Sequence, residues 1–209
     1  MLITYGDSIK KDGEASLNTL LNFVSNEAED VISAIHLLPM FPFTSDDGFS
    51  VVDYYEINKD LGDWSDINKL SQKYDLMFDA VINHASKSSE WFQKFLNRED
   101  KYKNYFVVGD PTLDYSSVTR PRALPLLTPF ETKEGIKHLW TTFSDDQIDL
   151  NFKSKDLLLE ILSILIYYAK RGSRFIRLDA IGFAWKKMGT TCMNLRSISF
   201  WHHKQYFYQ

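Results

Sequence analysis

A chain of 209 residues, 44% hydrophobic and 25% charged, has the composition of a globular protein that can bury one substantial core. Its formal net charge of −4 argues against broad binding to nucleic acids or anionic membranes, although one local basic site could still hold a small anion. We expect neither a secretory signal nor a membrane span, because the start lacks a basic stretch before an apolar core and the most apolar run, 157–169, is short and contains Glu160. Cys192 is the one cysteine, which excludes an internal disulfide and favours a reducing cytoplasm.

Apolar runs and helical spacing alternate along the chain. Short apolar segments ended by prolines or polar residues predict buried strands, and apolar residues three or four apart predict helices. The predicted strands are 2–5, 31–38, 76–83 and the segment that ends at Asp179. The predicted helices are 16–28, 63–74, a segment through 91–96 capped by Ser88 or Ser89, and 155–170.

This order of elements predicts an α/β fold with a parallel sheet and right-handed crossovers. Four strand–helix units fit either the first half of an incomplete (β/α)8 barrel or an open doubly wound sheet. The dinucleotide-binding form of the open sheet is disfavoured, because no Gly-x-Gly-x-x-Gly follows any strand. The span 101–142 is irregular and rich in proline, so we expect an inserted, loop-rich lobe after the third strand, at about 85–142.

Chemically capable side chains follow three of the predicted strands. Asp46 and Phe49 follow the second strand, His84 follows the third, and Asp179 ends the fourth. Parallel α/β folds place their ligand sites at the carboxyl ends of their strands, so these residues are expected to share one mouth. Each also has an ordinary interpretation: Asp46 as a turn residue, Phe49 as core, and His84 as a histidine satisfied at a strand end.

Arg177 and Asp179 form the most suggestive pair. Residues i and i+2 of a strand point to the same face, so the guanidinium would lie beside the carboxylate and hold it ionised and oriented. An oriented carboxylate is what a nucleophile needs to attack the anomeric carbon of a sugar. The alternative is a structural Arg–Asp pair that closes a strand.

Several motifs together resemble the α-amylase family of glycoside hydrolases, family 13. Three stretches are similar to its signature regions: 79–84 (DAVINH), 175–180 (FIRLDA) and 147–151 (QIDLN). Three more are similar to its sucrose phosphorylase branch: 36–42 (HLLPMFP), 46–49 (DDGF) and 186–192 (KKMGTTC). The stretch 120–130 (RPRALPLLTPF) resembles members that act on phosphorylated or carboxylated glucosides, and the similarity extends to about Leu195.

The resemblance implies a retaining glucoside phosphorylase, a glycosyltransferase that moves glucose from an α-glucoside to inorganic phosphate without a cofactor or metal. Asp179 would be the nucleophile that forms a glucosyl-aspartate, and Arg177 would position it. His84 and Asp46 would bind glucose hydroxyls, with Phe49 as an apolar platform beneath the ring. The glucoside could be sucrose, sucrose 6-phosphate, glucosylglycerate or glucosylglycerol.

The same resemblance gives a role to two arginines between the third and fourth strands. Arg120 and Arg122 would face the acceptor or phosphate, where a guanidinium suits an oxyanion. A solvated basic turn is the alternative.

The chain also departs from the family pattern. The family's general acid is a glutamate after the fifth barrel strand, yet no Asp or Glu follows Asp179. We therefore expect a truncated catalytic barrel over 1–195 that is inactive alone, followed by an aberrant tail, 196–209. The alternatives are a non-catalytic remnant and a retaining α-glucoside hydrolase. His202 and His203 in the tail are a weak indication of a metal site, because no acid accompanies them.

Overall fold

The computed structural model describes residues 1–193, and it divides into two compact units that are described separately. The first unit comprises Met1–Val81 and Ile161–Leu178. The second comprises Ile82–Glu160 and the described residues from Asp179 on. The boundaries expected for the inserted lobe stay a prediction, and the expected tail, 196–209, with His202 and His203, lies outside the described residues.

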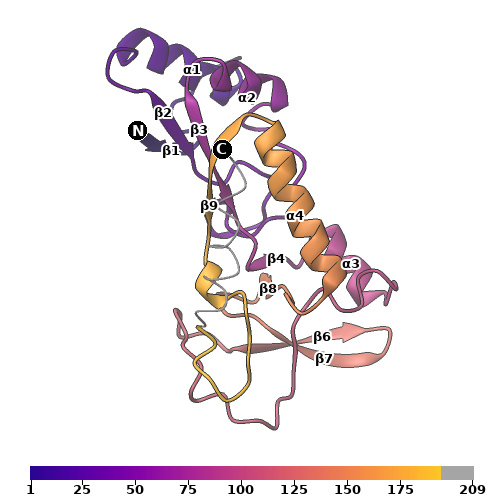
Figure 1. The fold of residues 1–209 in the computed structure, drawn as a ribbon. Helices are drawn as coiled ribbons and strands as arrows, with labels where there is room; N and C mark the ends of the chain where they lie inside the picture. Colours follow the sequence, from indigo (N-terminus) through magenta and orange to yellow (C-terminus); the bar gives the residue numbers. More distant parts are fainter. Residues whose placement is uncertain (194–209) are drawn as a thin grey trace. The chain divides into compact units, whose positions relative to one another are not determined.

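A four-stranded parallel sheet forms the centre of the first unit (Figure 1). Its strands are β1 (Leu2–Thr4), β2 (Ala34–Leu37), β3 (Asp75–Ala80) and β9 (Ser173–Leu178), and they neighbour one another in that order. Every pair is parallel. The sheet confirms the fold predicted from the sequence, the beginning of a (β/α)8 barrel whose strands follow one another in chain order.

Three helices connect these strands: α1 (Ser16–Glu27), α2 (Trp64–Ser71) and α4 (Lys155–Lys170), of which the part from Ile161 on belongs to the first unit. In α1, Leu17, Leu20 and Val24 recur at helical spacing and are buried. Helix α2 begins at a capping box, in which the Asp63 side chain accepts from the Ser65 amide and the Asp66 side chain accepts from the Asp63 amide.

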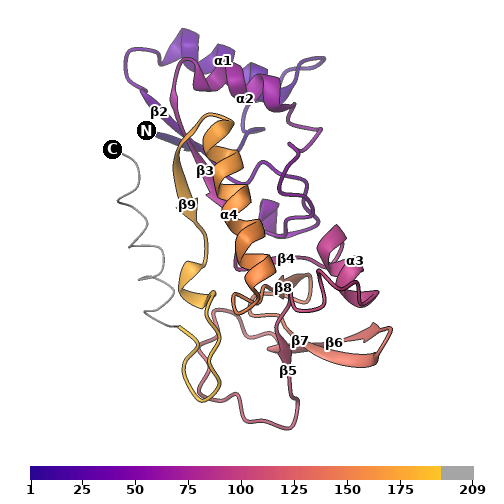
Figure 2. The same ribbon diagram turned by 45° about the vertical axis from the view of Figure 1, so that its right-hand side comes forward.

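Helix α4 covers one face of the sheet and lies along β9 and β3 (Figure 2). The Tyr168 ring meets Phe78 of β3 edge-on, with centroids 6.0 Å apart, and stacks on Phe41 at 4.8 Å. Such aromatic pairs bury large apolar areas, so they anchor the helix on the sheet.

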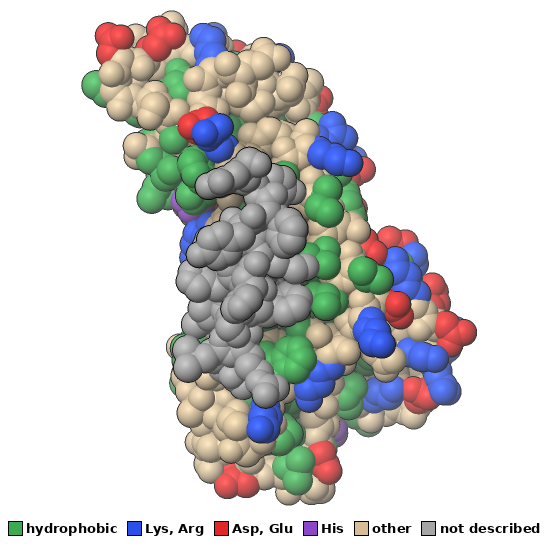
Figure 3. Space-filling model, viewed as in Figure 1, with side chains coloured by type: hydrophobic (Ala, Val, Ile, Leu, Met, Phe, Trp, Pro, Cys, Tyr) green, Lys and Arg blue, Asp and Glu red, His purple; other side chains and the backbone are tan. Residues whose placement is uncertain are grey.

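The opposite face of the sheet is poorly covered by the described chain. Ile3, His36, Met77 and Phe175 are register partners across the four strands, so they share this face. Ile3 is 63% exposed and Phe175 is 44% exposed. Figure 3 shows hydrophobic side chains at the surface near β1 and also along α4. In a complete barrel this face would point to the interior.

Strand β9 is therefore not the buried strand that its apolar sequence predicts. It stands at an edge of the sheet, and all of its residues are intermediate or exposed. By contrast, all four residues of β2 are buried, as expected for a strand covered on both faces.

The second unit is built from short antiparallel sheets, the helix α3 and the first residues of α4. Strand β4 (His84–Ser86) pairs with β8 (Gln147–Asp149), and α3 (Glu90–Leu96) is capped by the Ser89 hydroxyl. A second sheet has the order β5 (Val108–Gly109), β7 (Gly135–Trp140) and β6 (Leu127–Thr132). The hairpin β6–β7 corrects the expectation of irregular structure through 142, because Pro129 lies in an edge strand, where the missing amide breaks no ladder.

Among residues 1–193, no helix is both long enough and apolar enough to cross a membrane.

Candidate active site

Asp79 is the central buried charge of the first unit. It lies near the carboxyl end of β3 and is 1% exposed. Nε2 of His36, on β2, lies 2.8 Å from one carboxylate oxygen, and the Arg177 guanidinium, on β9, pairs with the other. Three neighbouring strands thus each supply one polar group, and the partners offset part of the cost of burying the carboxylate.

Tyr5 directly follows β1 and lies near the same carboxylates. Burial raises the pKa of its phenol, and so do the charges of Asp47, Asp46 and Asp79. The charges of Asp46, on the loop after β2, and of Asp79 thus both act on the phenol of Tyr5, which follows β1 at the edge of the sheet formed by the carboxyl ends of its strands. Negative charge gathered at this edge suits a ligand that donates hydrogen bonds, such as the hydroxyls of a sugar.

The turn that carries Asp46 has an unusual backbone. Asp46, Asp47 and Gly48 have consecutive φ angles of 56°, 50° and 99°. A Cβ on Gly48 would lie 2.8 Å from the Cβ of Pro39, so only glycine fits there. Aspartate tolerates the left-handed region better than most residues, but two in succession are uncommon, and such strain clusters at active sites. Phe49, partly buried, closes this turn by donating its amide to the Asp46 carbonyl at 2.9 Å.

In the second unit, His84 belongs to a buried polar network at the start of β4. Its Nδ1 lies 3.2 Å from the Asn83 amide nitrogen and its Nε2 lies 3.1 Å from that of Gln147. The ammonium of Lys186 contacts Asn83 Oδ1 at 2.9 Å and Asp149 Oδ2 at 2.7 Å. The Asp149 carboxylate also accepts hydrogen bonds from the amide and the hydroxyl of Thr142.

Asp179 directly follows Leu178, the last residue of β9, and is of intermediate exposure. The next residue, Ala180, is held in the left-handed region at φ 50° and precedes the short 3₁₀ helix η2 (Ile181–Phe183). Backbone strain thus stands immediately beside the predicted nucleophile, as it does at Asp46. That Asp179 is the nucleophile and that Arg177 positions it stay predictions.

Arg120 and Arg122 are exposed in a loop whose two ends are fixed in the second unit. Val118 and Leu126, at those ends, are both buried in one cluster with Trp140 and Cys192. In addition, the amide of Thr119 donates to the Thr191 carbonyl at 2.9 Å. Both arginines are thus exposed on a loop with an anchored base, as an anion-binding loop requires.

His36, Asp79 and Lys186 lie in the family-like motifs of the sequence and Tyr5 in a predicted strand, but none of the four was assigned a role of its own from the sequence. One feature of the sequence could have identified His36 and Asp79 as site residues: each is a lone polar residue inside an otherwise apolar strand. Such a residue needs a buried partner. Lys186 had no such signal, since nothing in its local sequence distinguishes it from its exposed neighbour Lys187.

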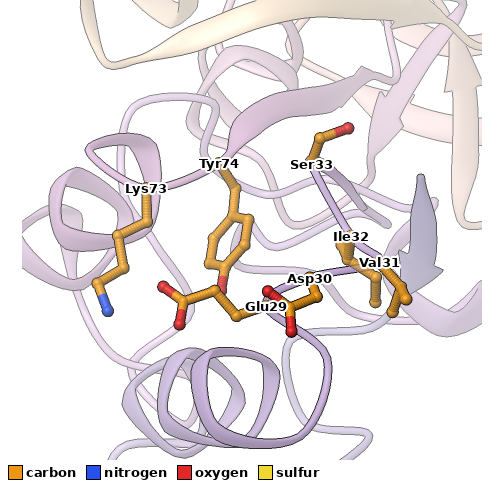
Figure 4. A pocket seen from close by; sticks show the side chains of 7 residues that line it. All are labelled: Glu29, Asp30, Val31, Ile32, Ser33, Lys73 and Tyr74. Carbon is orange, nitrogen blue, oxygen red and sulfur yellow. The ribbon is translucent and has the colours of Figure 1, made fainter.

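A hollow of ≈ 580 Å³ lies at the amino ends of β2 and β3 (Figure 4). It is lined by Glu29, Asp30, Val31, Ile32, Ser33, Lys73 and Tyr74. Because parallel α/β folds bind their ligands at the opposite, carboxyl ends, we assign it no role in the site. Within residues 1–193, no cluster of three or more His, Cys, Asp or Glu side chains could hold a metal ion.

Comparisons with known proteins agree on one family. The family model described as alpha amylase, catalytic domain, matches residues 30–201. A glucosylglycerate phosphorylase from Allomeiothermus silvanus is 52% identical over 195 residues, and a sucrose phosphorylase from Streptococcus mutans is 35% identical over 201. These matches cover 93% and 91% of this chain, but only 35% and 41% of the two relatives.

A solved structure supports the same fold. The crystal structure of sucrose 6F-phosphate phosphorylase from Thermoanaerobacter thermosaccharolyticum superposes with a TM-score of 0.87 at 30% identity. The superposition covers 97% of this chain and 44% of that one. The described chain thus corresponds to less than half of such a protein.

Proposed function

Since the chain belongs to the α-amylase family, we propose that it is the amino-terminal part of a retaining glucoside phosphorylase that acts on glucosylglycerate. The observation that carries the proposal is the 52% identity to a glucosylglycerate phosphorylase over 93% of the chain. Sucrose-type phosphorylases match at lower identity, so they support the reaction type more than this substrate.

In the proposed reaction the Asp179 carboxylate attacks the anomeric carbon and the glycosidic oxygen leaves with a proton. Inorganic phosphate then attacks the glucosyl-aspartate, releases α-glucose 1-phosphate and restores the carboxylate. The proton for the leaving oxygen is proposed to come from an acid in the portion of the relatives that this chain does not span. No cofactor is required by this chemistry, and a cytoplasmic location stays part of the proposal.

The geometry of the first unit supports a sugar at the carboxyl ends of its strands. The carboxylate of Asp46, held in a strained turn near Asp79 and Tyr5, is suited to accept hydrogen bonds from glucose hydroxyls. Phe49 would offer an apolar surface to the sugar ring. In the second unit His84 would bind a further hydroxyl, and Arg120 and Arg122 would bind the glycerate carboxylate or phosphate.

The test is a chimera in which residues 1–195 replace the corresponding part of the Allomeiothermus silvanus enzyme. We expect the chimera to release glucose 1-phosphate from glucosylglycerate only when phosphate is present. Asp179→Asn should lower kcat by roughly 10³-fold or more, as removal of a nucleophile does. Asp75→Asn, which changes an exposed carboxylate on β3, serves as the matched control.

Two outcomes would contradict the proposal. Release of glucose at the same rate without phosphate would identify a hydrolase. A chimera that folds but shows no Asp179-dependent turnover of any α-glucoside would identify a non-catalytic remnant.

A further inference from the structure

We propose that Lys186 fixes the proton of His84 on Nε2, acting through Asn83. Lys186 is 7% exposed, and its ammonium lies among three oxygens: Asn83 Oδ1, Asp149 Oδ2 and the Phe183 carbonyl. Asp149 is fully buried and its carboxylate lies 2.7 Å from the ammonium, so this ion pair holds the lysine in place.

The contact with Lys186 determines the orientation of the Asn83 amide. An ammonium has three donors and no acceptor, so the Asn83 atom that it contacts must be the oxygen. The amide NH2 therefore faces the other way, toward Nδ1 of His84 at 3.2 Å. Because an NH2 group only donates, Nδ1 must accept and cannot carry a proton.

The orientation of Asn83 in turn determines the role of the other ring nitrogen of His84, Nε2. A neutral imidazole has one acceptor nitrogen, so the amides of Asn83 and Gln147 cannot both donate to His84. The lysine fixes the orientation of the Asn83 amide, whereas the oxygen and nitrogen of the Gln147 amide are assigned from the partners around them. Gln147 therefore presents its oxygen to Nε2–H, and its NH2 donates to the Ser144 hydroxyl, which lies 2.9 Å from the same amide.

Lys186 is thus a positioning residue that acts on a ring it does not touch. If His84 binds a glucose hydroxyl, which rests on the proposed function, the hydroxyl oxygen must share or take over the Nε2 proton that Gln147 accepts in this structure, because Nδ1 already accepts from Asn83. The strand register supports the arrangement, because His84 of β4 pairs with Asp149 of β8, the partner of Lys186.

The experiment is nitrogen NMR of the full chain with ¹⁵N-labelled histidine, at about pH 8, above the ordinary range of histidine titration. His84→Gln identifies the His84 signals by their loss. We expect an unprotonated Nδ1 and a protonated Nε2. In Asn83→Asp the carboxylate still binds Lys186 but only accepts, so the proton should move to Nδ1. Lys186→Met should give a mixture of the two forms, whereas Lys187→Met, at an exposed neighbour, should leave the signals unchanged.

A protonated Nδ1 in the unaltered chain would overturn the proposal, and so would an unprotonated Nδ1 in Asn83→Asp. Neither result depends on Lys186→Met being folded. The spectra also require no turnover, so a failure of the proposed phosphorolysis in the chimera is distinguishable from a failure of this inference.

Discussion

Arg177 of β9 and Asp79 of β3 are register partners in adjacent parallel strands, and their side chains form an ion pair. The sequence pattern suggested a pair between Arg177 and Asp179 on the same strand. The structure gives Arg177 a buried partner on the neighbouring strand, and Asp79 also bonds His36, while the pair between Arg177 and Asp179 stays a prediction. One carboxylate therefore ties β2, β3 and β9 together near their carboxyl ends.

We predict that Asp79→Asn lowers the free energy of unfolding by roughly 2 kcal/mol, because it leaves a guanidinium without its buried counter-charge. The estimate lies below the usual range for buried pairs, since the Arg177 side chain is 45% exposed. Urea unfolding measures it. Asp75→Asn removes the exposed pair with Arg174 between the same two strands, at 3.4 Å, and should cost less than about 1 kcal/mol. Equal losses in the two variants would contradict the role of burial.

The fold could be predicted where local pattern decides it. The spacing of Leu17, Leu20 and Val24 specifies α1, and the apolar run through 34–37 specifies a strand buried on both faces. The partners of Asp79 could not be predicted, because His36 and Arg177 lie 43 and 98 residues away in sequence. Strand register decides which of them meet, and no local signal encodes it.

Some residues of the candidate site could likewise be predicted from the sequence, and others could not. The polar residues after the strands were found by their position, as with Asp46 and Asp179. The burial of Lys186 could not be predicted, because it depends on contacts with Asn83 and Asp149, which lie far away in the sequence. The hairpin β6–β7 was missed for another reason: Pro129 reads as a strand breaker unless the strand is known to lie at an edge.

Ala180→Gly should stabilise the chain by on the order of 0.5–1 kcal/mol, because a left-handed conformation costs an L-residue about 1–2 kcal/mol and part of the gain is lost to glycine's larger entropy in the unfolded state. The same change should lower kcat in the chimera, since the chain beside Asp179 becomes looser. Urea unfolding and steady-state kinetics measure the two effects. Ala184→Gly is the control, because Ala184 is buried with ordinary helical angles, and it should destabilise. A lower free energy of unfolding in Ala180→Gly would contradict the inference that the backbone of Ala180 is strained.

Asp63 should make the stability of α2 depend on pH. Hydrogen bonds from Ser65 lower the pKa of Asp63 from its ordinary value of 3.8. A lowered pKa in the folded state means that the contribution is present above the unfolded value and is lost as the pH falls through the folded one. Asp63→Asn keeps a good cap without a charge. We expect its melting temperature to be lower than that of the unaltered chain at about pH 6, and the gap to close in strong acid.

The control for this prediction is Asp12→Asn, which changes an exposed carboxylate. Its melting temperature should follow that of the unaltered chain at both pH values. A constant gap for Asp63→Asn would show that charge plays no part in the cap.

The face of the parallel sheet that residues 1–193 leave poorly covered should bind hydrophobic dyes. Ile3 and Phe175 are both exposed on it, so residues 1–209 alone should bind anilinonaphthalene sulfonate and associate at moderate concentration, without phosphorolytic turnover. The double variant Ile3→Thr with Phe175→Thr keeps residues suited to strands and should reduce the dye fluorescence. Val31→Thr, at a site 79% exposed outside the sheet, should not. Equal dye fluorescence in the unaltered chain, the double variant and Val31→Thr would show that the dye binds at a site other than this face of the sheet.

Arg120 and Arg122 should determine affinity for the anionic substrate rather than stability or rate. Both are exposed, so Arg120→Ala and Arg122→Ala should leave the melting temperature of the chimera unchanged. A lost charge-assisted hydrogen bond of about 1.5 kcal/mol corresponds to a roughly tenfold higher KM for glucosylglycerate or for phosphate, with kcat nearly unaffected. Lysine at either position should recover part of the affinity but not a bidentate contact.

Two comparisons separate this role from that of a solvated basic turn. Arg98→Ala removes another exposed arginine of the second unit, one that already pairs with Glu134 at 2.5 Å, and should leave both KM values unchanged. A neutral glucoside should lose little affinity in the Arg120 and Arg122 variants, because it offers no carboxylate. If KM for the neutral and the anionic glucoside rises equally, the loop acts through its shape. If neither rises, the two arginines do not contact the anion, and other residues bind it.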